Sequence, residues 1–319
     1  MHRDGCVRPE PHHRILSRQQ CRRSRAHRTG SRSARPIGVG LKSGDDRAAP
    51  SNRGLLDLSK LSLSRLREEL DALSDDEQVV RWALALQHDP RAGARVLGTR
   101  AQRQVDAVRS DRVRVEALFE IRARLYADGY RVVAGVDEVG VGPLAGPVVA
   151  AAVALPEKVE LPGLDDSKKV SRSDRERLEK SIREQALGVA LGEVSPVEID
   201  RMNIYRAGLE AMRRASTALA EQLTIDRFMV DARTIPGMTI PQTALVHGDA
   251  IEGSIAAASI VAKVYRDRLM GQLDAEYPGY GLGRNMGYGT PEHMSALGRL
   301  GACAVHRQSF APVAAAREI

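Results

Sequence analysis

The chain has 319 residues and a formal net charge of +7, and this charge is distributed unevenly. Residues 1–50 hold eleven Arg and one Lys against four acidic residues, which gives +8, so the remaining 269 residues sum to −1. Nucleic-acid binding by the globular part would therefore depend on local patches. Three scattered cysteines, Cys6, Cys21 and Cys303, exclude a disulfide framework and lack the paired spacing of a zinc site. No apolar run approaches the ~20 residues that span a bilayer.

Residues 1–54 are rich in Arg, Ser, Gly and Pro and carry no periodic apolar pattern. Such a composition buries too little apolar surface to offset chain entropy, which predicts a disordered leader. Three interpretations stay open: a basic arm that contacts phosphates, a transit-like targeting segment, or translated upstream sequence without a role. The last is favoured because charge runs are usually only solvated.

Residues 55–130 have the pattern of a small helical extension. Ser74 and Glu77 have the spacing of a capping box before an apolar helix that ends at Asp89-Pro90. Six further apolar residues fall on one face of a second helix, which Gly129 ends: Val108, Val115, Leu118, Phe119, Leu125 and Tyr126. Packing is the favoured role for this extension.

Residues 131–319 have a mixed α/β pattern. Strands are predicted at Val132 to Val136, Pro147 to Leu155, Leu187 to Val194, Ile225 to Val230 and Thr243 to Val246. Helices are predicted after a cap at Ser173, as one long helix from Pro196 to about Leu219 with Tyr205 on its apolar face, at residues 253–275, and near Glu292 to Leu300. This order predicts an α/β layer fold with helices flanking a sheet.

Four acidic residues follow or end predicted strands. Asp137 and Glu138 are consecutive, and Asp231 and Asp249 come after later strands. Because a strand points successive side chains to opposite faces, we expect the chain to leave strand geometry at Asp137 and Glu138, helped by Gly140 and Gly142. Gathered carboxylates predict a site for Mg²⁺ or Mn²⁺. A lone aspartate of this kind is more often a turn former or a cap.

Several segments together resemble the ribonuclease HII family, also called type 2 ribonuclease H, in its long form with an N-terminal helical extension. They occur in family order: Gly135–Pro147, Gly163–Lys169, Asn203–Tyr205, Met229–Asp231, Gly248–Asp249, Ser254–Lys263, Gly287–Thr290 and His306–Phe310. The resemblance covers essentially all of residues 131–319.

The resemblance implies a ribonuclease H-like fold, with a central mixed sheet flanked by helices. It also implies a metal-dependent endonuclease that cleaves RNA in RNA–DNA hybrids and at ribonucleotides embedded in duplex DNA, 5′ of the ribonucleotide, leaving a 3′-hydroxyl by two-metal-ion hydrolysis. The expected protein is monomeric and cytoplasmic, with roles in ribonucleotide excision and DNA replication. The division would be a leader at 1–54, a helical extension at 55–130 and a catalytic domain at 131–319.

The same resemblance assigns the site residues. Asp137, Glu138, Asp231 and Asp249 correspond to the family's catalytic and metal-binding acids. Substrate-binding positions correspond to Gly140, Val141, Gly142, Ser167, Lys168, Lys169 and Tyr288, the tyrosine stacking beside the ribose. His306 and Arg307 are expected near the C-terminal substrate surface.

Three positions depart from the family pattern. Val141 stands where the family has Arg, Ala232 where Gly follows the third acid, and Met286 where a basic residue precedes Gly287. These departures motivate an alternative, a hybrid-binding protein with weakened or lost catalysis. A third interpretation is a DNA nuclease of another ribonuclease H-like family, but the paired acids and the Gly287–Thr290 motif favour RNA-directed cleavage.

Overall fold

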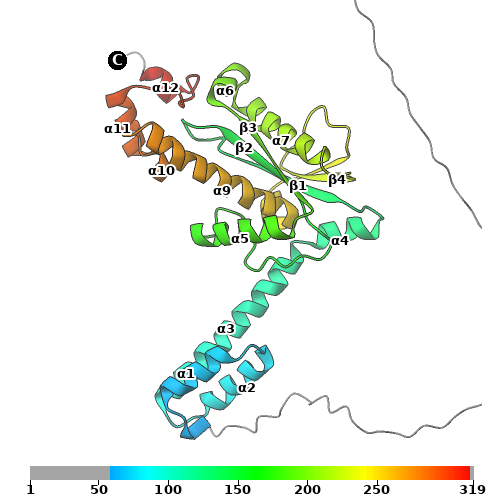
Figure 1. Cartoon of the computed structure of the whole chain (residues 1–319), viewed down its shortest axis with the longest axis vertical. Coiled ribbons are helices and arrows are strands. Elements are labelled where there is room, and N and C mark those ends of the chain that lie inside the picture. Colours follow the sequence, from blue (N-terminus) through cyan, green and yellow to red (C-terminus); the bar gives the residue numbers. More distant parts are fainter. Residues whose placement is uncertain (1–57, 317–319) are drawn as a thin grey trace, which may run out of the picture. The chain divides into compact units, whose positions relative to one another are not determined.

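A five-stranded mixed sheet forms the centre of the fold (Figure 1), and the computed structural model describes residues 58–316. The strands are β1 (Val133–Val139), β2 (Val148–Ala154), β3 (Gly188–Val194), β4 (Arg227–Asp231) and β5 (Gln242–Leu245). Their order is β3-β2-β1-β4-β5, with β1, β2 and β3 antiparallel and β1, β4 and β5 parallel. All five predicted strands are confirmed to within a few residues. The predicted leader, residues 1–54, lies outside the described residues.

Helices cover both faces of this sheet (Figure 1). On one face α7 (Ile204–Ala220) packs its alanines against β1 and β2. On the other face α9 (Gly253–Glu276) packs against β1 and β2, and α5 (Arg172–Gln185) packs against α9. The helices lie very close to the strands because small residues face them: a Cβ on Gly135 would be 2.0 Å from the Ser254 carbonyl carbon, and one on Gly192 would be 2.2 Å from the Ala211 carbonyl oxygen. The predicted α/β fold is confirmed.

The predicted long helix from Pro196 to Leu219 is wrong, because it is two helices. α6 (Pro196–Met202) ends at Asn203, which has a φ of 74° and whose side chain accepts from the Arg206 N–H to begin α7. The change of direction leaves Tyr205 56% exposed, although the periodicity assigned it to the buried face. The cap predicted at Ser173 is also displaced, because Ser171 accepts from the Asp174 N–H and begins α5.

Shorter helices complete the region after β5. They are α8 (Gly248–Ile251), α10 (Leu282–Asn285), α11 (Pro291–Leu300) and α12 (Ala311–Ala315). The predicted helices near 253–275 and 292–300 correspond to α9 and α11.

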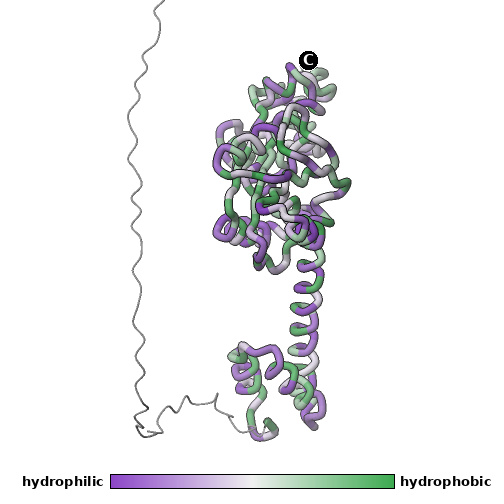
Figure 2. The backbone as a smooth tube through the Cα atoms, turned by 90° about the vertical axis from the view of Figure 1, so that its right-hand side faces the viewer, coloured by the Kyte–Doolittle hydropathy of each residue, from purple (hydrophilic) through white to green (hydrophobic). Residues whose placement is uncertain are grey.

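Helices also make up the described residues before β1, as predicted. A 3₁₀ turn (Leu58–Lys60) precedes α1 (Leu63–Ala72), α2 (Asp76–Gln87), α3 (Ala92–Ala117) and α4 (Glu120–Ala127). Hydrophilic and hydrophobic residues are interleaved along α3 (Figure 2). Two details differ from expectation: Asp75, not Ser74, caps α2, and the single helix ending at Gly129 is divided between α3 and α4.

The C-terminal part of α3 is tied to the segment that follows β2. Arg114 forms an ion pair of 3.3 Å with Asp165, and the Asp111 carboxylate accepts from the Gly163 N–H at 2.7 Å. Val108, expected on the packed face, is instead 55% exposed.

No helix within residues 58–316 is long and apolar enough to cross a membrane. The division at residues 54 and 130 stays a prediction.

Candidate active site

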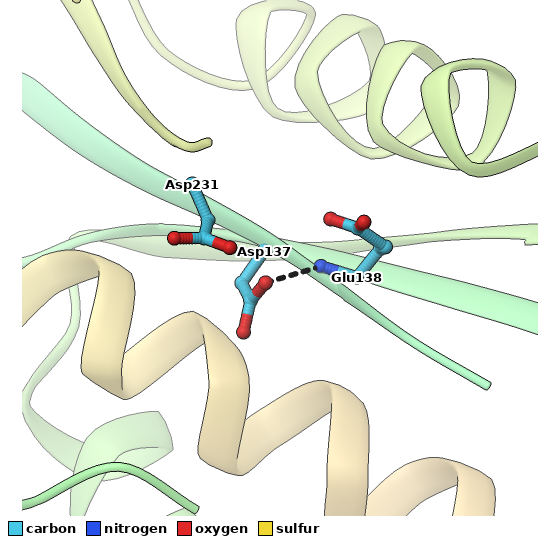
Figure 3. Close-up of side chains that lie close together, drawn as sticks. All are labelled: Asp137, Glu138 and Asp231. Atoms are coloured by element: carbon cyan, nitrogen blue, oxygen red, sulfur yellow. Dashed lines mark hydrogen bonds between the residues drawn. The ribbon is translucent and has the colours of Figure 1, made fainter. Parts of the chain in front are cut away.

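Three carboxylates converge where β1 and β4 run side by side. Asp137 and Glu138 belong to β1, and Asp231 is the last residue of the parallel neighbour β4. One carboxylate oxygen from each residue lies within 4.8 Å of the others (Figure 3). The parallel pairing of β1 with β4 aligns Val136 with Val230. The residues that follow them, Asp137 and Asp231, therefore lie side by side.

The expectation that the chain leaves strand geometry at the acid pair is wrong. β1 continues to Val139, with Asp137 opposite Ala151 and Glu138 opposite Ala150 in β2. The alternation holds, because Asp137 points toward α9 and Glu138 toward α7 (Figure 3). The two side chains point to opposite faces of the sheet but still share one site. They can do so because β4 ends beside them at Asp231, and no further β4 residue lies between the two faces.

Asp249 lies beside this cluster on α8. It is 8% exposed, and its Oδ2 is 3.5 Å from the Lys168 ammonium. The backbone N–H of the preceding Gly248 donates to Asp231 Oδ1 at 2.7 Å, which ties the start of α8 to the end of β4. Asp249 falls outside the three-residue group within 4.8 Å, and its role as a ligand stays a prediction.

The electrostatics of the cluster favour an added cation. Burial, and then the charge of Glu138, raise the pKa of Asp137 well above its usual value. Burial and Asp231 raise the pKa of Glu138, and burial raises the pKa of Asp231. Glu138 Oε2 is buried without a hydrogen-bond partner. The cluster consists of carboxylates, and one of their buried oxygens has no hydrogen-bond partner. Mg²⁺ and Mn²⁺ prefer such oxygen ligands.

Two buried arginines, Arg266 and Arg307, bind the carbonyl oxygens of the glycine turn that follows the acids. Gly140 has a φ of 89°, and a Cβ there would be 2.2 Å from Arg266 Nε. The Arg307 guanidinium donates to the carbonyl oxygens of Gly140, Val141, Pro143 and Gly146. Arg266 donates to those of Ala145, Pro147 and Met286. Burial lowers the pKa of Arg307 to about 9 and that of Arg266 to about 10.

This arrangement fixes the direction of the turn's peptide groups. In a trans peptide the N–H points opposite to the preceding C=O. With the Gly140 and Val141 carbonyls turned to Arg307, the N–H groups of Val141 and Gly142 point away from it. Tyr288 lies beside them, 47% exposed, and a Cβ on Gly142 would be 3.4 Å from its ring. The turn and the tyrosine therefore form one surface.

Comparisons with known proteins agree with this geometry. A sequence model of ribonuclease HII matches residues 134–313. The chain belongs to the ribonuclease HII family. It is 45% identical over 256 residues to the ribonuclease HII of Desulfitobacterium hafniense (strain Y51), covering 80% of this chain and 96% of that one. It is 53% identical over 200 residues to that of Moorella thermoacetica, covering 63% and 96%.

A solved structure supports the same assignment. Ribonuclease H2 from Pyrococcus horikoshii OT3 superposes with a TM-score of 0.51 at 26% identity, over 59% of this chain and 97% of that one. Family and fold together make the chain a ribonuclease H hydrolase, as the sequence predicted.

The predicted substrate-contacting residues of this ribonuclease HII family member have different surroundings. Ser167 is 4% exposed, and its Oγ is 2.9 Å from that of Ser259. Lys168 and Lys169 are exposed; Lys168 lies near Asp249, and Lys169 pairs with Asp165 at 3.5 Å. Ser167 thus anchors the loop that carries the two lysines.

Two residues expected at the C-terminal substrate surface are buried instead. His306 is 1% exposed and Arg307 is fully buried. His306 Nδ1 accepts from the Cys303 N–H at 3.1 Å, and its Nε2 lies 3.1 Å from His293 Nε2. His293 Nδ1 lies 2.9 Å from the Tyr288 carbonyl oxygen, so this pair of rings supports the Tyr288 loop from behind.

Of the three departures from the ribonuclease HII pattern, Ala232 and Val141 lie near the acids, whereas the Met286 carbonyl accepts from Arg266. Ala232 and Met286 both have a φ of 53°, in the left-handed region that favours glycine. Val141 is half-buried and packs against the core on the α7 side of the sheet. The backbone at Ala232 explains why glycine suits that position, whereas nothing in the structure explains Met286.

Proposed function

We propose that this chain is a metal-dependent endoribonuclease that cleaves RNA in RNA–DNA hybrids and at ribonucleotides embedded in duplex DNA. The cut lies 5′ of the ribonucleotide and leaves a 3′-hydroxyl. The observation that carries the proposal is the convergence of Asp137, Glu138 and Asp231 next to the surface of Gly142 and Tyr288.

Mg²⁺ or Mn²⁺ would be held by Asp137, Glu138, Asp231 and Asp249. When bound, two such ions supply an activated water and stabilise the leaving oxygen. Burial raises the pKa of Asp137, Glu138 and Asp231, so protons and metal ions would compete for the same carboxylate oxygens.

The chain's own groups would select and hold the ribonucleotide. The outward N–H groups of Val141 and Gly142 offer donors to the sugar and phosphate, and the exposed Tyr288 ring offers a surface for the ribose. The 2′-hydroxyl is the group by which a protein distinguishes RNA from DNA. Lys168 offsets the negative charge of Asp249, which would otherwise repel the nucleic-acid backbone.

A second candidate is a hybrid-binding protein with weakened or lost catalysis. Val141 favours it, because an apolar side chain on this surface supplies no charge to a phosphate. The three converging carboxylates favour the enzyme.

One assay separates these candidates. Purified full-length protein would be incubated with duplex DNA containing one ribonucleotide, and with the all-deoxy duplex, in Mg²⁺, in Mn²⁺ and in EDTA. We expect a single metal-dependent cut 5′ of the ribonucleotide and none in the all-deoxy duplex. Binding without cleavage in either metal would support the second candidate, and cleavage of the all-deoxy duplex would contradict both.

We also propose a monomer that acts in the cytoplasm in ribonucleotide excision and DNA replication. Light scattering after size exclusion tests the first part, since a mass near 34.7 kDa is expected and twice that mass would contradict it.

A further inference from the structure

Arg233 and Tyr205 form a stacked pair at the edge of the acidic cluster. Arg233 comes two residues after Asp231, and its guanidinium carbon lies 4.8 Å from the centre of the Tyr205 ring. Tyr205 stands in the first turn of α7, and it is 56% exposed whereas Arg233 is half-buried. Such stacking holds a guanidinium in place while its N–H donors stay in the plane of the group.

The backbone directs Arg233 to this position. After β4 the chain makes a tight turn in which the Arg233 N–H donates to the Asp231 carbonyl at 2.5 Å, with Ala232 at a φ of 53°. The turn keeps Arg233 close to the acids. The charge of Arg233 offsets part of the rise in the pKa of Glu138 that burial and Asp231 cause.

Arg233 nevertheless forms no ion pair with any carboxylate among residues 58–316. Two other arginines of the same region differ in this respect, because Arg213 and Arg214 are both paired with Glu210. The Glu138 carboxylate belongs to the acidic cluster and forms no ion pair with Arg233. The N–H donors of Arg233 are thus available to a ligand.

We propose that Arg233, held by Tyr205, binds a backbone phosphate of the nucleic-acid substrate on the α7 side of the acids. A planar guanidinium matches the oxygens of a phosphate in a bidentate manner. Lys168 lies 3.5 Å from Asp249, whereas Arg233 stacks on Tyr205 of α7, so two cations from different parts of the chain lie near the acids. A polyanion that approaches the carboxylates needs such cations, and Val141 supplies none. This inference rests on the proposed function, because it presumes a nucleic-acid substrate.

The test compares three variants with a matched control. Arg233→Gln removes the charge, Arg233→Lys keeps it without the planar group, and Tyr205→Leu removes the ring. Arg213→Gln is the control, since it removes an exposed arginine of α7 that is already paired. Binding of a fluorescent duplex with one ribonucleotide would be measured by anisotropy in EDTA at several salt concentrations, and kcat and KM would be measured with Mg²⁺.

We expect Arg233→Gln to weaken binding about tenfold and to reduce the salt slope of log Kd by about one, as for the loss of one phosphate contact. KM should rise by a similar factor while kcat changes little. Arg233→Lys should keep the salt slope but bind more weakly, and Tyr205→Leu should weaken binding several-fold.

Equal affinity and salt slope for Arg233→Gln and Arg213→Gln would overturn the inference while leaving the proposed function intact. If the wild-type protein binds the duplex but does not cut it, the proposed catalysis fails, and the salt slopes in EDTA still decide the role of Arg233. A wild-type protein that does not bind the duplex overturns both.

Discussion

The guanidinium of Arg307 donates a hydrogen bond of 2.9 Å to the carbonyl oxygen of Val141, 166 residues earlier in the chain. It makes three further bonds to carbonyls of the same turn. A buried charge without a carboxylate partner is costly unless its donors are satisfied. Arg307 meets that requirement with peptide oxygens, and in doing so it sets the conformation of the turn beside the acids.

Arg307→Lys should therefore damage both stability and substrate binding. An ammonium group has three donors and no planar fork, so it cannot replace four bonds in fixed directions. We expect a loss of about 2–4 kcal/mol in the free energy of unfolding, measured by urea denaturation. KM should rise more than kcat falls. Arg299→Lys, at an exposed position of α11, is the control. Equal stability of the two variants would show that the turn does not depend on Arg307.

Asp137→Asn should abolish cleavage and stabilise the metal-free protein. The pKa of Asp137 is raised well above its usual value, so at pH 7 the folded state bears a penalty for ionising it. An uncharged side chain of equal size removes that penalty, so we expect a higher urea midpoint for the variant than for the wild type when both are unfolded with EDTA.

Asp226→Asn is the matched control, because the pKa of Asp226 is lowered where that of Asp137 is raised. Asp226 accepts from the Arg131 and Val132 N–H groups at 2.6 and 2.9 Å, which lower its pKa. This variant should lose stability and keep metal-dependent cleavage. Cleavage at the wild-type rate by Asp137→Asn would contradict the assignment of the site.

Ala232→Gly should stabilise the protein modestly. Alanine at a φ of 53° bears a steric cost of about 1–2 kcal/mol, which glycine avoids at some cost in chain entropy. The net gain should be about 0.5 kcal/mol, seen as a higher urea midpoint. Ala107→Gly, at an exposed position within α3, should instead cost about 0.5–1 kcal/mol. A loss of stability in Ala232→Gly would show that the backbone at residue 232 is not strained.

His306 should make stability depend on pH. Burial, and then the neighbouring His293, lower the pKa of His306 from 6.5 to about 4. Between these values the unfolded chain binds a proton that the folded chain does not, so stability falls as pH drops from 6.5 to 4. The full effect is at most roughly 3 kcal/mol.

His306→Asn keeps an acceptor for the Cys303 N–H but does not titrate in this range. The variant should be less stable than the wild type at pH 7 and should lose less stability on acidification. Parallel curves of unfolding free energy against pH for the two proteins would contradict the burial of a neutral imidazole.

The sequence predicted the strands and the acids well because both depend on local patterns. Short apolar runs predicted all five strands, and three of the four acids fall in one cluster. The error at Asp137 and Glu138 has a physical origin: alternation was applied to β1 alone, whereas the end of β4 opens the edge to both faces. Where a neighbouring strand stops cannot be read from the alternation in β1.

Long-range contacts explain what the sequence analysis missed. Arg266 looks like an ordinary helix charge and Arg307 is expected at the substrate surface, yet both bond to carbonyls more than 100 residues away. Arg266 has no local signal except its place on the Ala-rich helix α9, most of whose N-terminal half is buried. The break at Asn203 was missed because apolar periodicity continues across it, and only the backbone angle shows the change.

The departure at Val141 allows a direct test of how the turn contacts the substrate. Val141 is half-buried, and its carbonyl rather than its side chain holds the turn to Arg307. Val141→Arg should leave the turn in place and add a charge-assisted contact, tightening binding by about 1 kcal/mol. Discrimination between ribonucleotide and deoxyribonucleotide should barely change, because phosphates are common to both.

Kinetics on matched duplexes with and without the 2′-hydroxyl measure both the affinity and this discrimination. A large change in that ratio at constant affinity would mean that the side chain, and not the backbone, recognises the sugar. Cleavage that appears only in Val141→Arg would instead support the binding protein with lost catalysis.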